Sequence, residues 1–253
     1  MPGREGNENM ARRSKVVADF DAAVADIPDG ATIAIGGFAQ PGVPFNLVAA
    51  LHRQGAKRLT CVANTTGGAH KPRMPDIGML VENGQVAKVM CSFTAATRAS
   101  DTLPFTPFYE RGEVEAEIVP QGTLAERLRA AGAGIPAFYT PTAVGTELAE
   151  GRETRTINGR DYLLEYALPV DVALLRAHQA DEAGNLRFRR SQRNFNPLMA
   201  MAAKLVIVEV EQPILPAGAI DPDDVHTPGI LVHRLVQIPP APEGLWPVKR
   251  EAR

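Results

Sequence analysis

The stretch DGATIAIGGFAQPGVP, residues 29–44, decides how the fold of this chain is read. Residues 32–35 are apolar and partly β-branched, which is typical of a buried parallel strand. The strand ends at Gly36 and Gly37, and Pro44 stands near the first turn of a segment with helical periodicity. A strand that feeds a helix through a glycine-rich loop presents free backbone N–H groups, which can hold an anion.

Three familiar glycine motifs do not fit this loop. The dinucleotide fingerprint G-x-G-x-x-G is absent, and so is the G-x-S-x-G elbow of serine hydrolases. Gly37 and Gly42 have the spacing of the first half of a nucleotide-phosphate loop, but Val43 and Pro44 replace its Lys and Ser or Thr. What is left is either a plain strand-to-helix turn or a loop of backbone donors without a side-chain nucleophile. An oxyanion hole is built in the second way.

The alternation of strands and helices continues outward from the loop. Further strands are expected at 58–64, 86–93, 113–119, 205–210 and 231–236. Helices are expected at 15–27, 74–82, 123–131 and 199–204. This pattern predicts an α/β fold, a single domain at residues 11–238 whose mixed, largely parallel sheet is flanked by helices on both faces. Residues 1–10 are expected to be a disordered leader and residues 239–253 a Pro-rich tail.

Two hairpins interrupt this alternation. Asn158-Gly159 predicts a two-residue turn between strands 154–157 and 160–164. A second turn at 182–185 is expected to join 172–177 to 186–189. The two hairpins together are expected to form a small lobe within residues 151–190.

Composition excludes several classes of partner. The 253 residues carry 27 Lys+Arg against 29 Asp+Glu, a net charge of −2 that attracts neither nucleic acid nor an anionic membrane. No apolar run approaches the roughly 20 residues that span a bilayer, and the N-terminus has no secretory signal. Cys61 and Cys91 lie in apolar runs and are expected to be buried free thiols in a reducing compartment. A cytoplasmic protein is therefore expected.

The whole string 29–44 resembles the signature of family I CoA-transferases of the α-subunit type. It has the acidic-Gly start, three apolar residues, Gly-Gly-Phe, three residues, and Gly-x-Pro. Further family-like strings follow in the same order: PQGTLAER at 120–127, AGIPAFYTP at 133–141, ADEAGN at 180–185 and RNFN at 193–196. The likeness covers residues from about 15 to 238. It implies CoA as a substrate, without a permanently bound cofactor or a metal.

The resemblance also assigns roles to this loop. The backbone of Gly37, Phe38 and Ala39 would form the oxyanion hole for the acyl carbonyl during thioester exchange, with Gly36 and Gly42 beside the substrate.

The resemblance implies a catalytic glutamate that this chain lacks. In the family a glutamate of the β subunit carries CoA as a thioester, within a Ser-Glu-Asn-Gly string followed by glycines. Here VENGQV at 81–86 contains Glu82, but Val81 replaces the serine and no glycine-rich turn follows. The glutamates at 113, 115 and 117 alternate on a strand and are expected to face solvent. The chain is therefore expected to act with a β subunit, in an α2β2 or similar assembly.

Other residues have two readings each. Asn64, at the end of a strand, either lines the site or caps a turn. Gln121 either donates to the acyl or thioester oxygen or caps the helix that begins there. A basic cluster either meets CoA phosphates or makes ion pairs and subunit contacts; it comprises Arg187, Arg189, Arg190 and Arg193. The five histidines, among them His226 and His233, show no ligand spacing and are expected to be non-catalytic.

Three departures from the family pattern concern the acyl pocket. A third glycine commonly follows Gly-Gly-Phe, where this chain has Ala39, and Pro41 removes a backbone donor. Phe45 replaces a position that is often acidic. The segment 95–108 is longer than its counterpart and matches it poorly.

Three functions are compatible with these observations. The favoured one is transfer of CoA between a carboxylic acid, such as succinate or acetate, and a 3-oxoacid such as acetoacetate or 3-oxoadipate. The second is hydrolysis of an acyl-CoA or a ring-ketone CoA, as in some relatives. The third is a ligand-sensing module without enzymatic activity. Such a regulator is expected to carry a DNA-binding helix-turn-helix at one end, and neither terminus has room for one.

Overall fold

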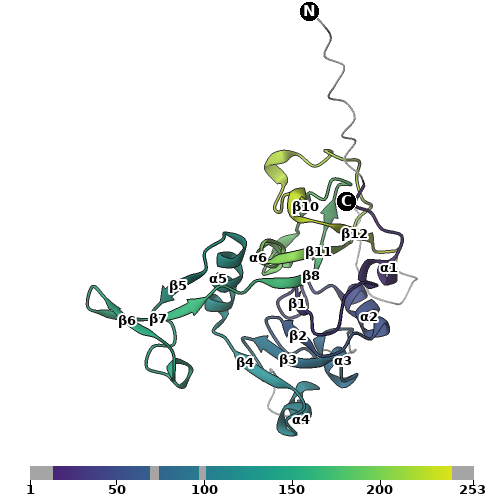
Figure 1. Cartoon of the computed structure of the whole chain (residues 1–253). Helices are drawn as coiled ribbons and strands as arrows, with labels where there is room; N and C mark the ends of the chain where they lie inside the picture. The colour runs from purple at the N-terminus through teal and green to yellow at the C-terminus, as the bar shows by residue number, and fades with distance from the viewer. Residues whose placement is uncertain (1–13, 69–73, 97–100, 241–253) are drawn as a thin grey trace, which may run out of the picture.

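A parallel sheet forms the centre of the computed structural model, which describes residues 14–68, 74–96 and 101–240 (Figure 1). Its seven strands are ordered β12-β11-β8-β1-β2-β3-β4, and every neighbouring pair is parallel. The strands are β1 (Thr32–Ile35), β2 (Leu59–Val62), β3 (Val86–Cys91), β4 (Glu115–Ile118), β8 (Val170–Ala177), β11 (Ala203–Val210) and β12 (Arg234–Gln237). The predicted α/β fold is confirmed, with the antiparallel strands in separate small sheets.

Helices pack on both faces of this sheet, as the alternation predicts. The α-helices are α1 (Phe20–Val24), α2 (Phe45–Gln54), α3 (Ile77–Glu82), α4 (Phe105–Glu110), α5 (Gln121–Gly132) and α6 (Asn196–Ala202). Short 3₁₀ helices are η1 (Glu147–Ala149), η2 (Arg190–Gln192), η3 (Pro222–Asp224) and η4 (Gly229–Leu231). Successive residues of β1 point to opposite faces: Ile33 and Ile35 join the core under α1 to α4, and Ala34 joins the core under α5 and α6.

The site region lies where the chain leaves the sheet in two directions. After β1 the chain passes to β2, β3 and β4, whereas after β8 it passes to β11 and β12 on the other side. Because β1 and β8 are neighbours, the loops that follow them diverge. Such a switch point leaves a crevice outside the carboxyl ends of the strands, where open α/β sheets bind ligands. The glycine loop at 36–44 follows β1 and therefore lies at this crevice.

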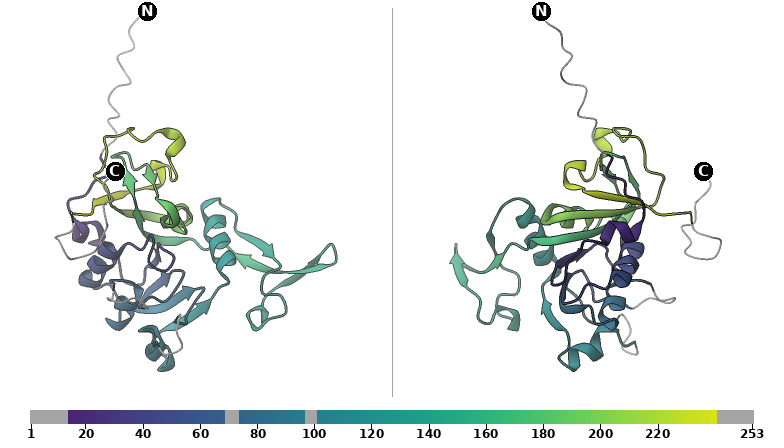
Figure 2. Two further views of the ribbon diagram at one scale, coloured as in Figure 1. Left: turned by 180° about the vertical axis from the view of Figure 1, so that it is seen from behind. Right: turned by 45° about the vertical axis from the view of Figure 1, so that its right-hand side comes forward.

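The first hairpin is confirmed. Asn158 and Gly159 both have positive φ, 52° and 77°, as a two-residue type I′ turn requires. It joins β6 (Thr154–Ile157) to β7 (Arg160–Tyr166), and β7 also pairs with β5 (Ala137–Thr140), a strand that the sequence pattern did not predict. This three-stranded antiparallel sheet projects from the body of the molecule (Figure 2).

The second hairpin is much shorter than predicted. Its arms are β9 (Gln179–Ala180) and β10 (Leu186–Arg187), and residues 172–177 instead belong to the central strand β8. The sequence pattern does not distinguish a hairpin arm from a central strand at residues 172–177. The reason is that β8 is buried on both faces, like a strand inside a parallel sheet. The two hairpins do not form one lobe: β6 and β7 belong to the three-stranded sheet with β5, whereas β9 and β10 form a separate two-stranded sheet (Figure 1).

Two predicted helices are partly extended chain. Val16 forms a parallel bridge with Leu235, so the first helix begins only at Phe20, after Asp19 has accepted a capping bond from the Ala22 amide at 2.7 Å. The helix predicted at 199–204 ends at Ala202, because the chain there enters β11. The predicted leader and nearly all of the predicted tail lie outside the described residues.

Both cysteines are buried free thiols, as predicted. Burial raises the pKa of Cys61 to about 12 and that of Cys91 to about 11, so neither is a ready nucleophile. Within the described ranges, no helix combines the length and the apolar composition needed to traverse a bilayer.

Candidate active site

The glycine loop folds into two short turns after β1. The Gly36 amide still bonds to Leu174 O of β8 at 2.9 Å, which fixes the point where the loop leaves the sheet. The Phe38 amide then donates to Pro41 O at 3.1 Å, and the Val43 amide donates to Gln40 O at 3.3 Å. These bonds define the backbone course of the loop.

The three backbone amides predicted to form the oxyanion hole differ in whether they already donate a hydrogen bond within the loop. Because the Phe38 amide is already bound to Pro41 O, it is not available to a ligand in this conformation. For the amides of Gly37 and Ala39, the structure provides no acceptor among the residues it describes. Ala39 has a φ of 53°, in the left-handed region that favours glycine, which explains why a glycine would suit this position.

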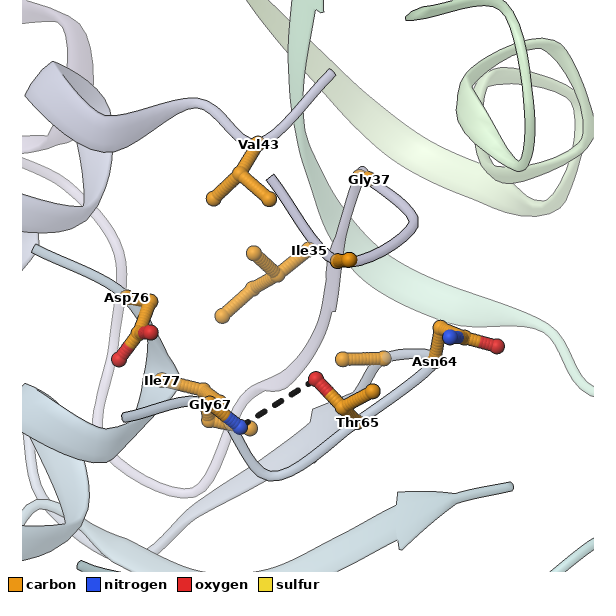
Figure 3. Close-up of a pocket in the computed structure, with 11 residues that line it drawn as sticks. Ile35, Gly37, Val43, Asn64, Thr65, Gly67, Asp76 and Ile77 are labelled. Atoms are coloured by element: carbon orange, nitrogen blue, oxygen red, sulfur yellow. Dashed lines mark hydrogen bonds between the residues drawn. The ribbon is translucent and has the colours of Figure 1, made fainter. Parts of the chain in front are cut away.

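A narrow pocket of about 30 Å³ opens on one side of the loop (Figure 3). This volume accommodates a water molecule or two. An acyl chain needs more room than this small pocket provides. The pocket is lined by Ile35, Gly36, Gly37, Ala39, Val43, Ala63, Asn64, Thr65, Gly67, Asp76 and Ile77. Figure 3 places Gly37 and Asn64 on one side of it and Asp76 on the other.

Asn64 and Gln121 meet beside this pocket, although 57 positions separate them in the sequence. Gln121 Nε2 donates to Asn64 Oδ1 at 2.6 Å. The side chain of Gln121 does not cap α5, and the turn after β2 is capped by Thr65, which accepts from the Gly67 amide at 3.3 Å. The simple capping readings of both residues are therefore wrong. Asn64 is 4% exposed, and its Nδ2 has no acceptor within the described chain.

Asp76 is a pocket residue that the sequence analysis missed. Its carboxylate accepts from the Gly68 amide at 2.6 Å and from the Gly78 amide at 3.0 Å, so it holds the loop after β2 against the start of α3. A Cβ on Gly67 would lie only 2.6 Å from this carboxylate. The available signal was its position before an apolar helical run, which is typical of an N-cap.

The segment 95–108 also packs near this pocket. Leu103 and Phe105 are buried, and a Cβ on Gly68 would lie 2.1 Å from Pro104 Cδ. Residues 97–100 of this segment lie outside the described residues. The described residues of this segment therefore pack against the loop that follows β2.

A wider pocket of about 370 Å³ lies on the opposite side of the glycine loop. It is lined by Gln40, Pro41, Gly42, Phe45, Arg176, Arg189, Arg190, Ser191, Gln192 and Glu211. Phe45, which the sequence analysis expected to shape the acyl pocket, lines this wider pocket and not the small one. The predicted basic cluster is divided: Arg189 and Arg190 face this pocket, whereas Arg187 forms an ion pair with Asp224 at 3.3 Å.

A buried glutamate supports the start of α2. Glu209, at the end of β11, is fully buried and accepts from the Asn46 and Leu47 amides at 2.9 and 3.0 Å. Burial raises the pKa of Glu209 to about 7, although Arg176, 3.6 Å away, and the two amides oppose this shift. Sequence reasoning missed this residue because it reads as the polar exception in the apolar strand at 205–210.

Comparisons with known proteins show which family this chain belongs to. A family model described as "Coenzyme A transferase" matches residues 17–237. This chain belongs to the Coenzyme A transferase family. It is 46% identical over 227 residues to the A subunit of the 3-oxoadipate CoA-transferase of Pseudomonas putida, covering 89% of this chain and 94% of that protein. It is 44% identical to the A subunit of the succinyl-CoA:3-ketoacid coenzyme A transferase of Helicobacter pylori, covering 88% and 91%.

Solved structures share the fold of this chain. The glutaconate coenzyme A-transferase from Acidaminococcus fermentans superposes with a TM-score of 0.76 at 26% identity, covering 89% of this chain and 76% of that one. A variant of the decarboxylase AibA/AibB superposes with a TM-score of 0.73 at 30% identity, covering 92% and 89%. The resemblance seen in the sequence is confirmed, and the chain is of the CoA-transferase A-subunit type.

In this CoA-transferase chain, Glu82, the glutamate of the VENGQV string, lies far from the glycine loop. Glu82 is the exposed last residue of α3 and precedes β3, so it lies at the amino edge of the sheet, opposite the glycine loop. Of the three glutamates on the β4 segment, Glu117 does not simply face solvent. It is partly buried and bonds to Lys88 at 2.7 Å and to Arg127 at 2.9 Å.

The histidines singled out in the sequence have structural partners. His226 Nδ1 accepts from the Phe188 amide at 2.9 Å, and His233 Nδ1 accepts from the Val206 amide at 3.1 Å. Burial lowers the pKa of both residues. Among the described residues, no three His, Cys, Asp or Glu side chains form a group that could hold a metal ion.

Proposed function

We propose that this chain is the α subunit of a cytoplasmic CoA-transferase that moves CoA between a carboxylic acid such as succinate and a 3-oxoacid such as acetoacetate or 3-oxoadipate. The names of its relatives support this substrate class. The observation that carries the proposal is the glycine loop, in which two backbone amides have no acceptor among the described residues, beside a pocket that contains Asn64.

The loop acts as the oxyanion hole. The Gly37 and Ala39 amides donate to the thioester oxygen as negative charge develops on it in the tetrahedral transition state. Removing one such donor typically lowers kcat by about 10²- to 10³-fold. Asn64 Nδ2 binds the acyl part of the substrate, with its side chain held by Gln121. Because these groups are fixed before the substrate arrives, little reorganisation is needed during the reaction.

The nucleophilic carboxylate comes from a β subunit. Asp76 is the carboxylate that lines the small pocket, and both of its oxygens already accept backbone amides. Glu82 lies at the other edge of the sheet. The relatives are named as A subunits, which implies a second kind of subunit, and an α2β2 complex would complete the acyl pocket. A glutamate of the partner then carries CoA as a thioester between the two half-reactions.

Trapping the thioester tests this assignment. The chain is co-expressed with its β subunit, and the complex is incubated with acetoacetyl-CoA or succinyl-CoA and then with borohydride. Peptide mass spectrometry is expected to find a reduced glutamate in the partner and none in this chain. Reduction of Glu82 would contradict the assignment of the nucleophile.

A second candidate is cleavage of an acyl-CoA without transfer. The decarboxylase neighbour, at 30% identity, shows that this scaffold is not restricted to transferases. A partner without the Ser-Glu-Asn-Gly string would favour this candidate. In the same experiment it predicts no trapped glutamate, and water cleaves the thioester to give the free acid and free CoA in the absence of an acceptor acid.

A further inference from the structure

Two asparagines bind consecutive carbonyl groups on the outer side of the glycine loop. Asn194 Nδ2 donates to Pro41 O at 2.9 Å and also to Ser191 O at 2.7 Å. Asn196 Nδ2 is within 3.3 Å of Gly42 O and donates to Gln192 O at 2.9 Å. The loop is thereby tied to the 3₁₀ helix η2 and to the start of α6.

Asn196 also fixes the two ends of the loop. It is fully buried, and its Oδ1 accepts from the Arg176 amide of β8 at 3.2 Å. A Cβ on Gly36 would lie 2.2 Å from this Oδ1, and a Cβ on Gly42 would lie 2.7 Å from Asn196 Nδ2. Because Gly36 and Gly42 have no Cβ, the Asn196 side chain can occupy the space beside them.

The loop needs this support because its conformation is not intrinsically favoured. Ala39 has a φ of 53°, where an alanine is strained by roughly 1 to 2 kcal/mol. Pro41 O accepts both the Phe38 amide, at 3.1 Å, and Asn194 Nδ2. The Asn194 contact therefore holds the same turn that sets the direction of the Gly37 and Ala39 amides.

We propose that Asn194 and Asn196 are positioning residues that hold the glycine loop in the conformation of an oxyanion hole. This inference rests on the proposed function. The two side chains lie on the side of the loop away from the small pocket, so they act through the loop backbone and not on the substrate. Their loss would loosen donors that are needed most in the transition state, which lowers kcat more than it raises KM.

Asn194 offers the sharper test because it is only partly buried. Asn194→Asp keeps the shape of the side chain and the oxygen that accepts from the Phe195 amide, but removes the NH₂ donor. Asn194→Ala removes both. The matched controls are Asn83→Asp and Asn83→Ala, which change an exposed asparagine at the opposite edge of the sheet. All variants are purified as the complex with the β subunit.

We expect both Asn194 variants to lower kcat by about 10- to 100-fold, with KM changed by less than about threefold. Both Asn83 variants should retain wild-type kcat. Thermal unfolding should stay within about 2 °C of the wild-type complex for the Asn194 variants, which separates positioning from loss of folding. Asn196→Asp should lower kcat at least as strongly where it folds.

Two results would overturn the inference. One is wild-type kcat in Asn194→Asp, which would mean that the NH₂ donor is not needed. The other is a rise in KM that accounts for the whole loss of kcat/KM. Failure of the proposed function looks different, because the wild-type complex itself would then transfer no CoA between acyl donors and acceptor acids.

Discussion

The two sides of the glycine loop differ in how completely their polar groups are satisfied. On the outer side, Asn194 and Asn196 bind the loop carbonyls, and Glu209 binds the first amides of α2. On the inner side, the Gly37 and Ala39 amides have no acceptor in the described chain. Under the proposed function, the outer contacts fix the loop backbone so that the inner amides can act as rigid donors to a substrate.

The largest expected effect comes from filling the outer side. Gly42→Ala places a Cβ 2.6 Å from Gln192 O, at a φ of 81°. We expect it to lower the free energy of unfolding by about 2 to 4 kcal/mol, combining strain and overpacking. Gly112→Ala is the matched control, because Gly112 has a φ of 70° but nothing within 4 Å of its Cβ position. Equal losses in urea denaturation would show that the outer contacts do not confine the loop.

On the inner side, the pair Asn64 and Gln121 should act as a unit. Asn64→Ala and Gln121→Ala are each expected to lower kcat/KM of the complex by about 10- to 100-fold, because each disrupts a donor beside the pocket. Since the two side chains share a 2.6 Å hydrogen bond, the double variant should lose less than the product of the single losses. We expect a coupling energy of about 1 kcal/mol. Purely multiplicative losses would contradict a shared role.

The third effect concerns Glu209 and pH. Its pKa is raised by burial to about 7 in the folded chain, above the ordinary value of 4.5. Between these values the folded state holds a proton that the unfolded state has lost, so this group makes the protein less stable as pH rises from 4.5 to 7. Glu209→Gln removes that dependence. The free energy of unfolding of the variant minus that of the wild type should therefore increase across this range, on the order of 2 kcal/mol.

Denaturant unfolding at several pH values measures this difference. Glu115→Gln, at an exposed position, serves as the control and should parallel the wild type. If the difference for Glu209→Gln stays constant from pH 4.5 to pH 7, the carboxylate is ionised throughout and the outer side depends on charge pairing with Arg176 instead.

The smallest effect is expected at Ala39. Ala39→Gly relieves the strain at a φ of 53° but increases the entropy of the unfolded chain. We expect stability to rise by less than about 1 kcal/mol. Asn158→Gly, at a φ of 52° in the exposed hairpin turn, should gain less, because asparagine tolerates this region better than alanine. A loss of stability in Ala39→Gly would show that the outer contacts alone define the loop.

The sequence by itself determined the features that depend on neighbouring residues. The strand 32–35, the glycine loop after it and the Asn158-Gly159 turn follow from local backbone preferences. The strings that resemble the family were enough to identify it, and the absence of a usable nucleophile indicated a partner subunit. The strand, the loop and the turn could be predicted because each rests on residues within a few positions of one another.

Tertiary structure decided everything that joins distant segments. It brought Gln121 to Asn64, Glu209 to the start of α2 and Asn194 to Pro41, contacts that span 57 to 163 positions. It also assigned residues 172–177 to the central sheet and Val16 to a bridge beside β12, against their local patterns. The physical reason is that side-chain hydrogen bonds and strand partners depend on packing and register, which no local pattern specifies.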